Sequence, residues 1–381
     1  MSRGTLVAAF LLALAVRTGI AIAHPPPLDL DQRNHLDLAT SMARGEGYVA
    51  EGRAETHIQP LVPALLAVAI RAMPVDPEIA SRIVALILSA LLAPACGAAF
   101  AAALGPREGI AAAAAVALEP HLALRGAYLE PEATAALLAA WLSLALLRAR
   151  AELSGSILGF LFLTRPEWIF VAPVGAIALV RRGVPARRLA GGAAILAGLV
   201  AVVPLYLHAL GGEWGISGKT RWVYLNGVHQ WRSGNRPLPQ DEVPALAREI
   251  GSPLSHAAAH PSEFVQGYLY RSWLLARNLA RALDVVLVPL AVAGLALALA
   301  ARPAAAAALA VPLAVLPVLP IGATYFRHTL ELTPVLLGFA ASGALCAWTR
   351  RGRLPTMRAC LRSRSSRRSS PPAISRARSS A

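Results

Sequence analysis

Long apolar runs separated by short polar breaks dominate the chain. An α-helix needs about 20 consecutive apolar residues to cross the hydrocarbon core of a bilayer, and several runs approach that length. Pro120, Arg125, Arg165 and Pro166 interrupt the middle of the series, so we expect some spans there to be short or broken. The pattern predicts an all-α polytopic bundle of about ten to twelve membrane-spanning helices. The predicted spans are residues 5–23, 58–73, 79–103, 107–125, 130–148, 155–181, 188–210, 282–301, 304–322 and 329–348.

The first run, TLVAAFLLALAVRTGIAIA, allows two interpretations. Ala21-Ile22-Ala23 resembles the cleavage site of a secretory signal peptide. We favour a membrane anchor, because the run is long enough to cross the bilayer and the chain continues with further spans. Arg17 lies inside this run, where a charge is costly in lipid. We therefore expect it to face protein or to extend to the outer surface.

Arginines indicate which side of the membrane each connection occupies. They crowd the connections 181–188 and 148–150, and the positive-inside rule places both on the cytoplasmic side, together with both termini. The two long polar segments, 24–57 and 211–281, then face outward. In this topology 155–181 forms two short helices joined by a turn at the outer face. A second topology keeps 155–181 as one span and moves the 148–150 connection outside.

Composition and charge support a membrane protein. The 381 residues are 56% hydrophobic and 15% charged, which is too apolar for an ordinary soluble domain. Ten arginines in the acid-free stretch 349–381 supply most of the net charge of +15, so the basicity does not indicate nucleic-acid binding. We predict one transmembrane domain over 1–348 and a disordered, basic, cytoplasmic tail over 349–381. Cys96, Cys346 and Cys360 suggest neither a disulfide framework nor a metal cluster.

A gently amphipathic, acidic segment follows the first apolar run. Its apolar residues fall at helical spacing between 32 and 44, which predicts a short helix lying at the outer interface and ended by Gly45 and Gly47. Asp31 precedes the first turn and is well placed to cap it. The apolar positions are Leu36, Leu38, Ala39, Met42 and Ala43.

The same segment carries the first part of a family resemblance. Asp31-Gln32, His35, Ala39, Met42 and the turn Gly45-x-Gly47-Tyr48 match the spacing of a signature that follows the first span in membrane glycosyltransferases of the GT-C class. Further similar elements follow in the same order along residues 5–348. They are Gln59-Pro60-Leu61-Val62-Pro63, Tyr128-Leu129-Glu130-Pro131, Leu163-Thr164-Arg165-Pro166-Glu167, and Tyr325-Phe326-Arg327-His328 leading into Pro334.

The branch that the chain most resembles contains the protein mannosyltransferases and the aminoarabinose transferases, which are similar to glycosyltransferase family 39. The resemblance implies an inverting enzyme that moves a sugar from a polyprenyl-phosphate carrier to a lipid, glycan or protein acceptor on the outer face of a bacterial-type inner membrane. Gln32 stands where the family often has Glu, and His35 and His328 where it often has Tyr. The large soluble domain of some relatives has no counterpart in this sequence.

The resemblance assigns the general base to Asp31, and a carboxylate suits that role because the attacking hydroxyl must lose its proton. Asp29 is the alternative base, in which case Asp31 only caps the helix. Gln32 and Glu130 are expected to bind the substrate. The alternative for Glu130 is a purely structural role, as an acid that complements the dipole at a helix start beside Pro131.

The leaving group is a phosphate, and nearby cations stabilise its growing charge. Four basic residues lie where predicted spans meet the outer membrane surface. For two of them, Arg165 and Arg327, the alternative is a structural role in a buried ion pair with Glu167, Glu130 or Glu331. The four are Arg165, Lys219, Arg221 and Arg327.

Two other functional classes stay open at this stage. A flippase or transporter of lipid-linked sugars also needs many spans and intramembrane arginines, but the sequence shows no pair of related halves. A non-catalytic GT-C relative is the other alternative. The sequence implies no cofactor: the histidines have no metal-ligand spacing, and one Asp-centred loop argues mildly against a divalent ion without excluding it.

Overall fold

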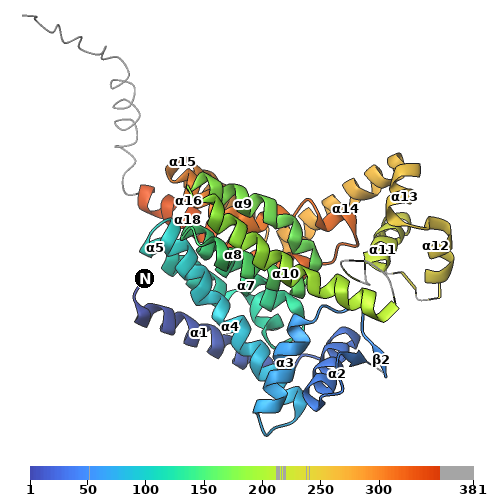
Figure 1. Ribbon diagram of the computed structural model, residues 1–381. Coiled ribbons are helices and arrows are strands. Elements are labelled where there is room, and N and C mark those ends of the chain that lie inside the picture. Colours follow the sequence, from blue (N-terminus) through green and yellow to red (C-terminus); the bar gives the residue numbers. More distant parts are fainter. Residues whose placement is uncertain are drawn as a thin grey trace, which may run out of the picture.

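The computed structural model describes residues 1–351 except 51, 212–214, 216, 218–219, 237 and 240. The protein is a helical bundle with two groups of elements at one end (Figure 1). Most of the predicted tail, 352–381, lies outside the described residues, so the division into 1–348 and 349–381 stays a prediction. The expected all-α fold of a polytopic membrane protein is confirmed.

The bundle is built from helices of very unequal length. They are α1 (Arg3–Ala23), α3 (Leu61–Ala72), α4 (Pro77–Ala103), α5 (Pro106–Leu118), α6 (Pro120–Leu124), α7 (Pro131–Leu147), α8 (Ala151–Thr164), α9 (Ala172–Arg181), α10 (Ala186–Gly211), α15 (Leu287–Ala301), α16 (Pro303–Ala310), α17 (Arg327–Leu330) and α18 (Thr333–Arg351). Short 3₁₀ turns connect several of them: η1 (Arg125–Ala127), η2 (Pro166–Val171), η3 (Val311–Val315) and η4 (Leu319–Ile321).

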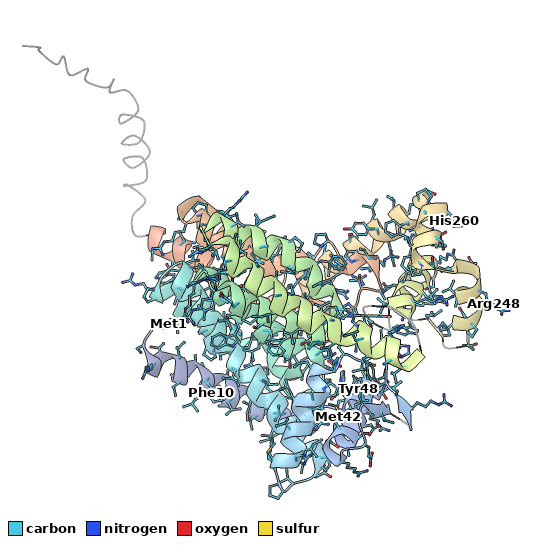
Figure 2. All side chains as sticks on the ribbon, in the orientation of Figure 1. Met1, Phe10, Met42, Tyr48, Arg248 and His260 are labelled. Carbon is cyan, nitrogen blue, oxygen red and sulfur yellow. The ribbon has the colours of Figure 1, made fainter. Side chains whose placement is uncertain are left out.

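The two polar segments fold into small elements at the end of the bundle away from the N-terminus (Figure 1). The first contains α2 (Leu30–Arg44) and a two-stranded antiparallel hairpin, β1 (Val49–Ala50) and β2 (Arg53–Ala54). The second contains α11 (Thr220–Arg232), α12 (Val243–Ile250), α13 (Pro253–Ala259) and α14 (Pro261–Ala282). Tyr48 follows α2 and meets α10, where its ring centroid is 6.0 Å from that of Tyr206 (Figure 2).

Fewer helices reach spanning length than the apolar runs suggest. In the described part of the chain, four helical segments are long and apolar enough to cross a membrane, and the number is five only if one bent pair of helices is counted as a single span. Prolines shorten the others: Pro120 divides the predicted span 107–125 into α5 and α6, because proline lacks the N–H that a continuing helix needs. The four are Arg3–Ala23, Pro77–Ala103, Ala186–Leu210 and Pro303–Ile321, and the bent pair is α14 with α15.

The predicted break in 155–181 is present. Helix α8 ends at Thr164, Arg165 is extended with φ −154° and ψ 119°, and α9 resumes the helical path at Ala172. Pro166 explains the break, because the residue before a proline is driven out of the helical region. The extended backbone places the Arg165 side chain at the helix end rather than on a helix face.

Arg17 faces protein and not lipid. Its side chain is fully buried between α1, α4 and α5, and it donates hydrogen bonds to Ser89 Oγ (2.7 Å) and to the carbonyls of Val116 (3.1 Å) and Ala117 (3.2 Å). The Val116 carbonyl loses its usual helical donor four residues later, because Pro120 has no N–H. Arg17 therefore satisfies the carbonyls left open where α5 ends.

Small residues allow α15 and α18 to approach closely, as is common between membrane helices. A Cβ atom added to Gly294 would lie 1.9 Å from the Phe339 carbonyl oxygen. Gly294→Ala is therefore expected to destabilise the protein by about 1–3 kcal/mol through overpacking. Thermal unfolding in detergent measures this, with Gly198→Ala in α10 as the control. Nothing lies within 4 Å of a Cβ at Gly198, so a comparable loss there would contradict the packing argument.

Candidate active site

A cavity of about 310 Å³ opens at the polar end of the bundle, between the elements of the two polar segments. Its walls come from parts of the chain far apart in sequence: the start of α2, the loop before α3, the start of α7, the α8–η2 break, α11, and the stretch from η4 to α17. The lining contains charged side chains that pair with one another as well as apolar residues. The apolar lining includes Phe170, Val223, Val318, Leu319 and Ile321.

Helix α2 presents Asp31 to the cavity. The buried side of α2, which includes Leu38 and Ala39, packs toward α3, where Ala39 joins a hydrophobic cluster with Val62 and Leu66. This packing leaves the Asp31 side chain 42% exposed at the first turn. The helix begins two residues earlier than predicted.

The expectation that Asp31 caps this helix is wrong. Asp29 is the N-cap, and its Oδ1 accepts a hydrogen bond of 3.0 Å from the N–H of Gln32. The cap falls on Asp29 because α2 starts at Leu30, which leaves the Asp31 carboxylate available for contacts across the cavity. Asp29, the alternative base, is not among the cavity-lining residues.

Arg327, at the start of α17, connects Asp31 to the acidic residues at the start of α7. Its guanidinium pairs with the Asp31 carboxylate, and it lies 3.9 Å from carboxylate oxygens of both Glu130 and Glu132. The Arg327 side chain is 28% exposed, so a ligand in the cavity has access to it. This contact joins residues separated by 296 positions in the sequence.

Arg165 is the more deeply enclosed cation, with a side chain 12% exposed. It pairs with Glu331, with Glu167 at 2.9 Å and with Glu132 at 3.3 Å. Trp168 Nε1 also donates to the second oxygen of Glu331 at 2.8 Å. The acids that the sequence offered as partners of Arg165 and Arg327 lie beside them: Glu167 and Glu331 contact Arg165, and Glu130 lies 3.9 Å from Arg327.

Glu130 occupies the N-cap position of α7 without a capping hydrogen bond from its side chain, and it is buried, with a side chain 5% exposed. Arg125 approaches it at 3.1 Å, and the same guanidinium stacks over the ring of Tyr128 with 4.4 Å to the ring centroid. Pro131 at the first helical position fixes the turn that carries both Glu130 and Glu132.

Gln32 is fully buried and acts as a structural brace. Its Nε2 donates to the Pro27 carbonyl (2.8 Å), and its Oε1 accepts from the Leu129 N–H (3.4 Å). Gln32 thus joins the first polar segment to the residue preceding Glu130 and does not line the cavity. Of the two remaining predicted cations, Arg221 donates to the Ala247 carbonyl (2.7 Å) and does not line the cavity, and Lys219 lies outside the described residues.

The loop before α3 forms another wall, through His57, Ile58 and Gln59. Burial disfavours a charge on Glu55, but hydrogen bonds from the His57 side chain and from the N–H groups of His57 and Ile58 outweigh it and lower the pKa of Glu55 to about 2. Glu55 is therefore ionised at neutral pH, and its hydrogen bonds hold His57 and Ile58 in place within this loop.

Two buried acceptor atoms at the cavity have no hydrogen-bond partner within the described residues. They are Oε2 of Glu132 and Oε1 of Gln59, and these residues are 5% and 8% exposed. Sequence reasoning did not select Glu132 as a site residue. Its position two residues after Glu130, on a helix started by proline, was the available signal.

No group of three or more His, Cys, Asp and Glu side chains arranged to hold a metal ion occurs in the part of the chain that the structure describes. The carboxylates at the cavity are instead interleaved with guanidinium groups. Arginine therefore supplies the positive charge that these residues contact.

The fold is similar to that of an archaeal glycosyltransferase. An oligosaccharyltransferase from Archaeoglobus fulgidus, solved in complex with Zn and sulfate, aligns with a TM-score of 0.58 at 12% identity over 94% of this chain and 51% of that one. Its apo form aligns with a TM-score of 0.57 at 12% identity over 94% and 52%. This chain therefore spans about half the length of the solved relative. No protein-family model and no curated protein sequence matches it.

At this level of identity the likeness establishes the fold alone. The oligosaccharyltransferase is a GT-C glycosyltransferase, so the GT-C fold implied by the sequence resemblance is confirmed. The particular branch of protein mannosyltransferases and aminoarabinose transferases stays a prediction. The chain is thus an all-α membrane protein of GT-C fold with a charged cavity at one end.

Proposed function

We propose that the protein is an inverting glycosyltransferase that moves a sugar from a polyprenyl-phosphate donor to a lipid, glycan or protein acceptor. The observation that carries the proposal is the Asp31–Arg327 pair, a half-exposed carboxylate beside an accessible cation in one cavity. In this proposal the cavity faces outward from a bacterial-type inner membrane, with both termini in the cytoplasm.

The chemistry needs a base and a phosphate-binding cation close together. Asp31 takes the proton of the attacking hydroxyl, and Arg327 stabilises the charge that grows on the departing phosphate. The two groups neutralise each other without substrate. When the donor phosphate occupies the cavity it competes for Arg327, which frees the Asp31 carboxylate to act as a base.

Arg165 has a different role in this proposal. Three carboxylates already surround its guanidinium, and its side chain is less exposed than that of Arg327. We assign to it the positioning of Glu132, and to Glu130 the orientation of Arg327. Phosphate contacts by Lys219 and Arg221 stay predictions from the sequence.

A carbohydrate matches the acceptor atoms of the cavity. Glu132 Oε2 and Gln59 Oε1 are buried without a partner in the described structure, and a buried acceptor left unpaired costs free energy. Sugar hydroxyl groups are hydrogen-bond donors that supply the missing partners. The apolar lining of the cavity, which includes Phe170 and Ile321, suits the hydrocarbon of the carrier.

The variant Gln59→Leu is expected to weaken donor binding without lowering the stability of the protein. Leucine fills a similar volume and removes a buried unpaired acceptor, so thermal stability is expected to stay equal or rise. The loss of a hydrogen bond to the sugar is expected to raise the KM for the donor by about tenfold. Steady-state kinetics and thermal unfolding measure the two effects. An unchanged KM would exclude Gln59 from donor binding.

The function itself is tested by incubating membranes that contain the protein with a panel of radiolabelled polyprenyl-phosphate sugars. The proposal predicts that label leaves the carrier and enters an acceptor. Movement of the intact labelled lipid between leaflets without transfer would instead establish a flippase. Neither transfer nor movement with any donor in the panel would support a non-catalytic relative.

A further inference from the structure

Helix α14 carries two sharply different faces. One face is buried against the cavity wall: Arg271, 2% exposed, donates from Nε to the Pro320 carbonyl (2.6 Å) and from a terminal nitrogen to the Gly227 carbonyl (2.7 Å). Pro320 belongs to η4, whose neighbours line the cavity. The position of α14 therefore fixes one wall of the site.

The other face exposes an apolar stripe. Val265, Leu269 and Trp273 are spaced by four residues and are 52%, 61% and 56% exposed. Residues at this spacing lie one above another on a helix. Gln266, on a neighbouring face, is polar and also exposed. A continuous exposed stripe of this kind marks a surface that contacts something apolar.

The geometry of the next helix indicates what covers the stripe. Helix α15 is strongly apolar and meets α14 at a bend of 97°. If α15 crosses the membrane, α14 must run nearly parallel to the membrane plane. Val285 and Val286, in the connection between them, are 67% and 71% exposed, so the apolar surface continues from the stripe into the spanning helix. Figure 1 shows α14 extending away from the bundle toward α13.

The charges on α14 are complementary to a lipid surface. The Arg277 guanidinium lies 5.0 Å from the ring centroid of Trp273, and Arg281 is exposed in the last turn before the connection to α15. Interfacial helices combine an apolar face with arginines that contact anionic headgroups, and tryptophan is favoured at this depth.

We propose that α14 lies in the plane of the membrane at its outer surface, with Val265, Leu269 and Trp273 inserted between lipid headgroups and acyl chains. The occupant of the stripe is the lipid leaflet. Because Arg271 ties α14 to η4 in the cavity wall, the depth of α14 in the leaflet then determines how far that wall lies from the bilayer. This inference is independent of the reaction that the cavity performs.

Depth-dependent quenching tests the proposal. Single cysteines at Val265, Leu269 and Gln266, in full-length protein whose native Cys96, Cys346 and Cys360 are replaced by alanine, are labelled with an environment-sensitive dye. The protein is placed in phosphatidylcholine–phosphatidylglycerol vesicles carrying bromine at shallow or deep acyl positions. We expect shallow bromine to quench the two stripe positions equally, and at least about twofold more than the matched control Gln266.

Two outcomes would overturn the proposal. Depth that increases steadily along the helix would show a broken span or a re-entrant segment. Equal and weak quenching at all three positions would show that the stripe faces water or a protein. A second measurement keeps the native cysteines: the bromine quenching of intrinsic tryptophan fluorescence is compared between the parent and Trp273→Phe. The proposal therefore stays testable even if the cysteine-free protein does not fold.

Discussion

Asp31→Asn is expected to lower the rate of sugar transfer by about 10³-fold while leaving the protein folded in the membrane. Asparagine keeps the size and the hydrogen-bonding oxygen of the side chain but cannot accept the proton of the attacking hydroxyl, and general-base catalysis contributes about 10²–10⁴-fold. Because Asp29 and not Asp31 caps α2, the substitution leaves the helix start intact. The measurement is label transfer per amount of detergent-extracted, folded protein.

Asp37→Asn is the matched control. Asp37 lies on the same helix, is exposed, and is not among the residues that line the cavity. Transfer by this variant is expected to stay within about twofold of the parent, since surface substitutions away from a site have small effects. Full transfer by Asp31→Asn would exclude Asp31 as the base.

Arg165→Ala is expected to have the largest effect on stability. The substitution removes the cation from Glu331, Glu132 and Glu167, and the first two of these are 3% and 5% exposed. Breaking a buried ion pair from one side typically costs about 3–5 kcal/mol, because the remaining charge is left without compensation. Thermal unfolding in detergent is the measurement, and the yield of folded protein is expected to fall with it.

Two comparisons separate this mechanism from a general loss of side-chain contacts. Arg232→Ala removes two ion pairs, with Glu249 and Glu263, of an arginine that is 34% exposed, and it is expected to cost no more than about 1 kcal/mol. Adding Glu331→Gln to Arg165→Ala removes one of the stranded charges and is expected to recover part of the stability. An Arg165→Ala protein as stable as the parent would contradict the network described above.

The features that sequence predicted best depend on local chemistry. The interfacial helix was expected over 32–44 and occupies Leu30–Arg44, because the apolar spacing and Gly45 specify it locally. The break before Pro166 is present for the same kind of reason. The GT-C fold was predicted from the order of several short sequence motifs, although each motif alone carries little information.

Other features depend on contacts that sequence spacing does not contain. Arg327 was a candidate for phosphate contact, but its pairing with Asp31 joins opposite ends of the chain and follows only from the packed bundle. Glu132 was missed because an acid in the first turn of a helix is usually explained by the helix dipole. The cap is Asp29 and not the expected Asp31 because the helix starts two residues earlier than predicted, which is within the normal error of pattern reading.

The stereochemistry of transfer tests the central claim most directly. The claim is that Asp31 activates an acceptor hydroxyl for a single direct displacement of the carrier phosphate, and such a displacement inverts the anomeric centre. The measurement is the anomeric configuration of the product formed by purified protein from a donor of known configuration, read by nuclear magnetic resonance. The account predicts inversion. Retention would require a covalent sugar–protein intermediate and would contradict the role assigned to Asp31.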